Sequence, residues 1–395
     1  MIRPVLYVDL PGIIYALDRR ARARQGEFAD FVIAPEDDEP RSGRAAFLNA
    51  IWPITPSAHT WICEDRWRLL GLAQARSRPG AQAWDLHSLA AMASPGGQTP
   101  TVAPQDVLLE LVQFALNAAI QRGVHRFFLR IEDERPELEL LAKMGFQRYA
   151  RELTYCLPME ALSTATDGES SRAPGWKRTR LAHLLGLAGA DRYAASAGMV
   201  DDLSLRSWHH HDAWGLLRLY DACTPKRVQV AESLTSEELV YTRAGGGRAH
   251  SLPLVEPMCV AYVVDRGVRL GGWVRLRFGR GQQPHHLSVM AHPDEPDLPL
   301  ALVRFGLRVL AQQARLPVVC HVREYETATV DALGDAGFEQ VGIRALLVRH
   351  LTMRALRPQE VSTLEPRVAY GVRGLGTAQT RLIKGEKTHY ATHDH

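Results

Sequence analysis

The chain has 395 residues, 46% of them hydrophobic and 23% charged, which suits two or three globular domains with cores of their own. Its net charge is +3, from 47 basic and 44 acidic side chains, which argues against a nucleic-acid binder, and no apolar run is long enough to span a membrane. Five cysteines lie far apart without metal-pair spacing, and no signal-type apolar core follows the N-terminus, so we expect a cytoplasmic protein with reduced thiols.

The first 157 residues predict a fixed succession of elements. The clearest is a long helix, because apolar residues recur at helical spacing between positions 108 and 119, after Pro104 and before Gly123. It follows three antiparallel strands and precedes a buried strand, a short helix and a closing strand. Strands are expected at 5–8, 60–63, 68–76, 83–93, 127–131 and 147–157, and helices at 9–24, 104–122 and 136–144.

The second half follows the same order. Strands are expected at 205–208, 259–264, 268–278, 285–291, 317–322 and 343–351, and helices at 212–223, 299–314 and 327–335. Residues 160–175 are rich in Ser, Thr, Gly and Pro, which is typical of a linker, and 176–200 are compatible with a helix. The predicted organisation is an N-terminal domain at 1–157, a linker with a possible helix at 158–202, a C-terminal domain at 203–355 and a disordered tail at 356–395.

Short sequence matches show that the second half repeats the first. Leu-Val-Gln-Phe-Ala-Leu begins at Leu111 and returns as Leu-Val-Arg-Phe-Gly-Leu at Leu302. Each half ends its short helix with Gly-Phe, at 145–146 and 337–338, and Arg-Leu-Leu-Gly at 68–71 pairs with Arg-Leu-Gly-Gly at 269–272. A period this long has the length of a domain, not of a solenoid repeat, so the pattern indicates a duplicated domain.

This order of elements, with the Gly-Phe endings, resembles the GNAT superfamily of N-acetyltransferases, and two copies resemble its tandem members. The resemblance covers about 1–157 and 203–355. It implies an α/β protein with two tandem GNAT-like domains, each a mixed, mostly antiparallel sheet flanked by helices. It also implies acetyl-CoA as co-substrate, bound where the middle strand runs into the long helix, at a motif of the form Gln/Arg-x-x-Gly-x-Gly/Ala.

The N-terminal half keeps only part of that motif. The resemblance assigns cofactor contacts to Met92, Ser94, Gly96, Gly97 and Gln105, since small residues let backbone N–H groups approach a pyrophosphate. Leu108 and Glu110 fall in the small-residue slots. A flexible loop is the alternative interpretation of the glycine pair.

The C-terminal half departs further from the motif. Pro296 and Pro299 replace the Gln/Arg and the first Gly, so two donating N–H groups are absent. Asp294, Glu295 and Asp297 add negative charge where a pyrophosphate would bind. The sequence therefore predicts that this half does not hold CoA in the family's usual way.

Catalytic residues are expected in the N-terminal half. The family often places a Tyr proton donor four residues before the Gly of Gly-Phe, but Leu141 and Leu333 stand there. His87 lies on the middle strand, where some family members use histidine to relay the proton of the amine, and Asp85 on the same strand face is its possible orienting partner. The alternative is that His87 and its counterpart His285 are ordinary half-buried strand residues.

Three consecutive histidines at 209–211 invite comparison with a metal site. Adjacent strand residues point to opposite faces, and no cysteine or distant carboxylate is tied to them by spacing, so a polar loop and no metal is the prediction.

Two functions remain open from the sequence. The first is an acyltransferase that moves an acetyl group from acetyl-CoA to an amine, active if at all in the N-terminal half. The acceptor, whether a small-molecule amine, a protein N-terminus or a lysine, is not specified by the residues, nor is the oligomeric state. The second is a non-catalytic GNAT-like pseudoenzyme that binds a small ligand or a protein; neither function involves a nucleic acid or a membrane.

Overall fold

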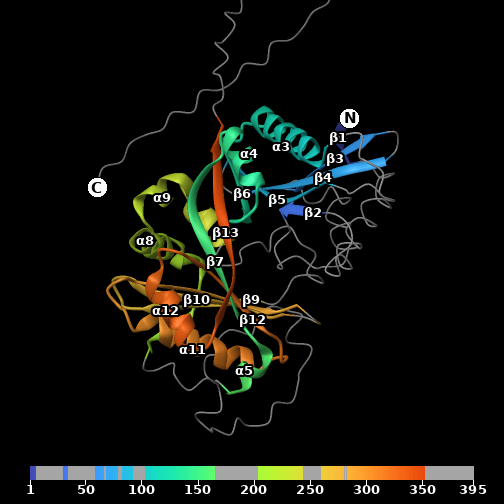
Figure 1. Ribbon diagram of the computed structural model, residues 1–395. Coiled ribbons are helices and arrows are strands. Elements are labelled where there is room, and N and C mark those ends of the chain that lie inside the picture. The colour runs from blue at the N-terminus through green and yellow to red at the C-terminus, as the bar shows by residue number, and fades with distance from the viewer. Residues whose placement is uncertain are drawn as a thin grey trace, which may run out of the picture. The chain divides into compact units, whose positions relative to one another are not determined.

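The computed structural model describes residues 1–5, 30–33, 58–65, 68–78, 82–91, 103–164, 203–242, 259–279, 281 and 283–351. These residues belong to one compact unit, Met1–Met353 (Figure 1). The helix expected at 9–24, the loop at 92–102, nearly all of the linker and the tail lie outside the described residues. The boundaries proposed between domains stay a prediction.

In the N-terminal half the expected strand trio and long helix are present. The elements are β1 (Ile2–Pro4), β2 (Asp30–Ile33), β3 (Ala58–Asp65), β4 (Arg68–Ser77), β5 (Ala83–Ala91), α3 (Pro104–Gln121), β6 (Arg126–Glu132), α4 (Glu137–Lys143), β7 (Gln147–Leu157) and α5 (Met159–Thr164). Helix α3 buries one side against the sheet, including Leu111 and Leu116, as its apolar spacing predicts.

The C-terminal half repeats this order and adds short helices after the first one. Its elements are β8 (Leu205–Ser207), the 3-10 helix η3 (His210–Asp212), α8 (Ala213–Cys223), α9 (Lys226–Glu232), α10 (Ser236–Thr242), β9 (Cys259–Asp265), β10 (Leu270–Arg277), β11 (His285–Ala291), α11 (Leu298–Ala311), β12 (Val318–Arg323), α12 (Thr327–Asp335) and β13 (Glu339–His350). The predicted α/β class, with mostly antiparallel pairing and flanking helices, is confirmed.

The two halves share one sheet because they exchange their closing strands. The strand order is β1-β3-β4-β5-β6-β13-β7-β12-β11-β10-β9-β8, with β2 beside β5. Strand β13, the last of the C-terminal half, lies between β6 and β7 of the N-terminal half (Figure 1). Strand β7 in turn pairs with β12 of the C-terminal half. Each half therefore supplies a strand to the other.

Buried charges hold the seam between the halves. Arg323 of β12 lies 3.5 Å from Glu152 of β7 and 3.2 Å from Glu232 at the end of α9. The Tyr220 hydroxyl also donates to Glu232, at 2.7 Å. All three charged side chains are nearly inaccessible. Arg130 lies 3.9 Å from Glu152 and adds a second cation to the cluster, so the buried charges compensate one another.

The Gly-Phe endings of the two short helices have one physical explanation. Gly145 and Gly337 take φ values of +86° and +84°, which favour glycine. The following Phe146 N–H donates to Leu141 O, and Phe338 N–H donates to Leu333 O, which closes each helix in a Schellman motif. The two phenylalanines are buried in the cores of their halves.

Gly71 and Gly272, paired by the repeat, let each long helix approach the sheet. A Cβ on Gly71 would lie 2.6 Å from Val107 of α3, and one on Gly272 would lie 2.9 Å from Leu302 of α11. Both distances are shorter than ordinary contacts of a Cβ, so a side chain at either position would force its neighbours to shift.

Helices α8 and α9 cover the opposite face of the sheet. Leu216 and Leu219 of α8 pack on Trp273, and Ala231 of α9 packs on Phe128 of the N-terminal half. All five cysteines are free thiols. In the part of the chain that the structure describes, no helix combines the length and the apolar character needed to cross a membrane.

Candidate functional site

A β-bulge marks the predicted catalytic strand at His87. Strand β5 pairs in parallel with β6 from Ala83 onward, and this pairing ends at Leu86↔Leu129. Across β4, Leu86 pairs with Ala75 and Ser88 with Gln74, so His87 is the extra residue. Bulges of this kind turn backbone and side chains away from the regular ladder and are common beside active sites. The predicted site residue His87 therefore lies where β5 and β6 separate.

Asp85 has a partner that the sequence did not predict. Arg78 Nε and Nη2 donate to its two carboxylate oxygens at 2.7 and 2.6 Å. This bidentate pair fixes the carboxylate beside the half-buried His87. Each carboxylate oxygen can accept a second hydrogen bond in addition to the one from Arg78. Asp85 can therefore still orient His87, and this role stays a prediction.

His285, the counterpart of His87 in the C-terminal half, has a structural role. His285 is fully buried; its Nδ1 accepts from Gly279 N–H at 3.0 Å, and its Nε2 donates to Ala314 O at 2.7 Å. Burial lowers its pKa, so the neutral ring is favoured. Since both ring nitrogens bind backbone, His285 is not placed to accept a proton from a substrate.

Four of the five predicted cofactor residues lie outside the described part of the chain. Met92, Ser94, Gly96 and Gly97 fall outside the described residues. Gln105 is exposed in the first turn of α3. The assignment of these residues to acetyl-CoA stays a prediction.

Strand β2 lies along the end of β5 that leads toward the expected cofactor loop. Asp30 pairs with Ala91 and Phe31 with Ala90, antiparallel to β5. This is the edge of β5 that β6 leaves unpaired beyond Leu86. Backbone of the same chain therefore pairs with the end of β5 that leads into the expected cofactor loop.

The loop before α11 uses several of its backbone N–H groups internally. His292 N–H donates to Gly271 O at 2.7 Å, Glu295 N–H to His292 O at 2.9 Å, and Leu298 N–H to Glu295 O at 3.1 Å. Asp294 N–H donates to the His292 ring at 3.2 Å. Donors needed to cradle a pyrophosphate are thus already engaged.

Acidic side chains of the same loop are paired with arginines of the β9–β10 turn. Arg266 lies 2.7 Å from Glu295, and Arg269 lies 2.7 Å from Asp294. A Cβ on Gly271 would meet the Glu295 carboxylate at 2.5 Å, so that carboxylate lies directly over the strand. An entering phosphate would meet the Glu295 carboxylate over the strand and would have to break ion pairs that hold Arg266 and Arg269.

The positions of the family's Tyr proton donor are part of the core. Leu141 packs beneath α3 and Leu333 beneath α11, and both are buried. Neither half has a hydroxyl at this position to protonate a leaving thiolate.

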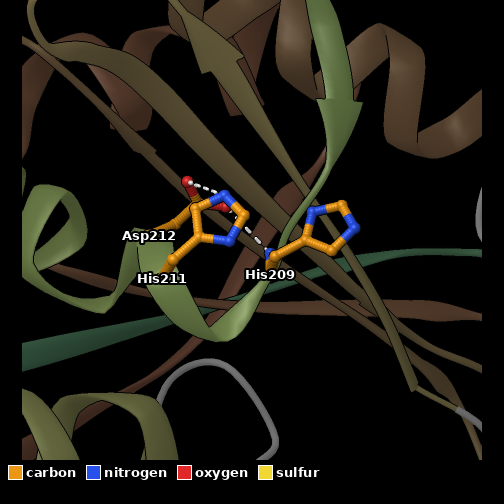
Figure 2. Close-up of side chains that lie close together, drawn as sticks. All are labelled: His209, His211 and Asp212. Carbon is orange, nitrogen blue, oxygen red and sulfur yellow. Dashed lines mark hydrogen bonds and ion pairs between the residues drawn. The ribbon is translucent and has the colours of Figure 1, made fainter.

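His209, His211 and Asp212 lie close together at η3, within 4.8 Å of one another by their ligand atoms (Figure 2). However, Arg206 Nη1 and Nη2 each donate to Asp212 at 2.7 Å, and His209 N–H also donates to that carboxylate. Burial tends to raise the pKa of Asp212, but the hydrogen bonds from Arg206 hold it below its usual value. Arg206 already supplies the cation, and we assign no metal to this cluster.

Comparison with solved structures gives the fold. A tandem GNAT protein from the clavulanic acid biosynthesis pathway, solved without acetyl-CoA, is 14% identical, with a TM-score of 0.50 over 89% of this chain and 98% of that one. The chain has the tandem GNAT fold. A GCN5-related N-acetyltransferase from Sphaerobacter thermophilus, 12% identical, also has a TM-score of 0.50, over 89% of this chain and 95% of its own. No family model and no curated protein matches the sequence.

Within this fold, the repeat in the sequence corresponds to two copies of one arrangement. In each copy the middle strand pairs in parallel with the buried strand for a few residues and then leaves it, at Leu86↔Leu129 and at Leu287↔Cys320. The two copies differ in chemistry. In the first copy His87 lies at a β-bulge, and in the second copy the loop before α11 is held by its own hydrogen bonds and ion pairs. Identity at this level gives the fold and not the activity.

Proposed function

We propose that this chain is an N-acyltransferase that transfers the acetyl group of acetyl-CoA to an amine, and that the reaction takes place in the N-terminal half. The observation that carries the proposal is the bulge at His87, where β5 separates from β6 in a tandem GNAT fold. The C-terminal half is the weaker candidate, because Glu295 and Asp294 form ion pairs with arginines in the loop where a pyrophosphate would bind.

In the proposed reaction the amine nitrogen attacks the thioester carbonyl carbon. A C–N bond forms, the C–S bond breaks, and CoA leaves as a thiolate. His87 takes the proton of the amine, and backbone N–H groups of β5 near the bulge stabilise the tetrahedral oxyanion. Because Leu141 replaces the proton donor, water protonates the thiolate, and turnover is expected to be slow.

A titration of the full chain with acetyl-CoA, followed by an assay of free CoA thiol with a panel of amines, tests this function. The panel includes small amines, amino acids and peptides with a free N-terminus or lysine. Saturable binding and amine-dependent thiol release support the proposal. Absence of both across the panel refutes it.

The alternative is a non-catalytic GNAT-like module, and one observation favours it: β2 occupies the edge of β5 beside the expected cofactor loop. Replacing Phe31 with proline weakens this strand, since proline removes a backbone donor. The alternative predicts no acetyl-CoA binding in the parent or in Phe31→Pro. Binding gained only in Phe31→Pro would mean that β2 blocks the cofactor site.

A further inference from the structure

Helix α9 of the C-terminal half packs on strands of the N-terminal half, on the face of the sheet opposite α3. Ala231 of α9 lies in one buried cluster with Phe128 of β6 and Ala83 of β5. Phe128 pairs in register with Asp85, which comes two residues before the bulged His87. Side chains in register on adjacent strands lie on the same face of a sheet. The C-terminal half therefore packs beside the strand segment that carries the candidate site.

Arg126, at the start of β6, fixes the end of α9. Its Nη1 donates to the backbone carbonyls of Glu232 and Ser233, to the latter at 3.0 Å. Its Nη2 lies 3.7 Å from the carboxylate of Glu238 in α10, a side chain with no exposed surface. A cation is favourable at the C-terminus of a helix, where carbonyl groups lack helical partners. One arginine of the N-terminal half thus joins β6 to both α9 and α10.

Arg78 connects this contact to Asp85. Its guanidinium donates to both carboxylate oxygens of Asp85 and lies 3.9 Å from the centroid of the Phe128 ring. The guanidinium of Arg126 lies 5.9 Å from the centroid of the same ring. Arg78 is only 8% exposed, so its position is set by these contacts and hardly by water. The place of the Asp85 carboxylate therefore depends on Phe128, which packs on Ala231 of α9.

Glu238 belongs to the same group of charges, although it comes from the C-terminal half. Burial raises the pKa of Glu238, a hydrogen bond from Thr235 N–H and the charges of Arg126 and Arg78 oppose this shift, and the charge of Asp85 adds to it. Two arginines and a carboxylate of the N-terminal half thus interact with one carboxylate of α10. Removal of the charge of Glu238 should change the balance that holds Arg78 and Asp85 in place.

We propose that α9 and α10 of the C-terminal half are part of the N-terminal site, with Arg78 as the positioning residue for the Asp85 carboxylate beside His87. Glu238 and Arg126 hold the contact on which this position depends. A bidentate arginine–carboxylate pair is directional, so a shift of Arg78 moves Asp85 with it. The inference rests on the acyl transfer proposed above for the N-terminal half. It gives the C-terminal half a role in that reaction.

The first measurement is kcat of the full chain per folded molecule. Arg78→Gln should lower kcat by about 10- to 100-fold with little change in KM for acetyl-CoA, because a displaced carboxylate impairs proton transfer and not cofactor binding. Glu238→Gln keeps the shape of the side chain and removes its charge, and it should lower kcat by about 3- to 30-fold. Glu237→Gln is the matched control: Glu237 is exposed on the same helix, and this variant should keep the parent's kcat.

The second measurement needs no substrate. The ring signals of His87 in the NMR spectrum, identified by their loss in His87→Gln, should shift in Arg78→Gln and in Glu238→Gln but not in Glu237→Gln. If Arg78→Gln unfolds, Arg78→Lys replaces it, since lysine keeps the charge without the bidentate geometry and should also shift these signals.

The two measurements separate this inference from the proposed reaction. The inference is overturned if Glu238→Gln leaves kcat and the His87 signals the same as in Glu237→Gln, or if the variants of Arg78 leave them as in the parent. Shifted His87 signals in an otherwise inactive parent protein would support the contact between the halves and refute acyl transfer itself.

Discussion

Arg323 and Glu152 lie directly opposite each other on β12 and β7, and their side chains form a buried ion pair across the seam between the two halves. Arg323 also pairs with Glu232 of α9. One guanidinium thus ties together the exchanged strand, its neighbour in the C-terminal half and a helix that covers both.

Replacing Arg323 with methionine should destabilise the protein by about 3–5 kcal/mol, because two buried carboxylates lose the arginine that pairs with both of them. The measurement is the free energy of unfolding in urea. Arg304→Met is the control, since Arg304 is exposed on α11, and it should change the free energy by less than about 0.5 kcal/mol. A loss below about 1 kcal/mol for Arg323→Met would mean that the seam does not depend on this pair.

Gly71→Ala and Gly272→Ala should each destabilise the protein by about 1–3 kcal/mol, because the added methyl group collides with the long helix of its half. Gly334→Ala in α12 is the control: nothing lies within 4 Å of its Cβ, and alanine favours helix, so stability should hold or rise. Thermal unfolding of the three variants compares them. Equal melting temperatures would contradict the packing role of the paired glycines.

Much of the fold could be predicted from the sequence, because each element predicted in one half could be compared with the corresponding element in the other half. Strands β5 and β11 and helices α3 and α12 lie within two residues of their predicted bounds. The strand exchange was not predictable, because β7 and β13 have the same alternating pattern whichever strand they pair with. Helices α9 and α10 were missed; their seven-residue lengths give little periodicity.

Lowering the pH from 6 to 4.5 should reduce stability partly through His286. Its folded pKa of about 2 lies below the unfolded value of 6.5, so in this range the unfolded chain binds a proton that the folded protein excludes. Stability from this group is complete above pH 6.5 and is lost as the pH falls, at up to about 1.4 kcal/mol per pH unit. His286→Gln should flatten the slope of unfolding free energy against pH by about that amount.

The control for this measurement is His125→Gln, because His125 is exposed. Its slope should match the parent's. If His286→Gln also keeps the parent's slope, the folded protein and the unfolded chain bind a proton at His286 equally well, which contradicts the lowered pKa of this side chain.

The candidate site was only partly predictable. His87 was selected from its strand position, but its bulge depends on how β4 pairs with β5, which the sequence does not encode locally. The pairing of Asp85 with Arg78 was missed because the two residues lie on either side of a turn. A small cavity lined by Arg275, His286 and His321 was also missed, because these residues come from three strands that only the sheet brings together.

If the N-terminal half catalyses acetyl transfer, His87→Ala should lower kcat by about 10²–10⁴-fold, the usual effect of losing a general base. KM for acetyl-CoA should change little, and the acidic limb of the pH profile should disappear, which a merely structural role of His87 would not cause. His125→Ala, an exposed change in the same half, should keep full activity. His285→Ala should reduce stability, because His285 binds Gly279 and Ala314, while activity per folded molecule is retained. Equal activity of His87→Ala and the parent would refute the role given to His87, and an inactive parent would shift the weight to the binding module.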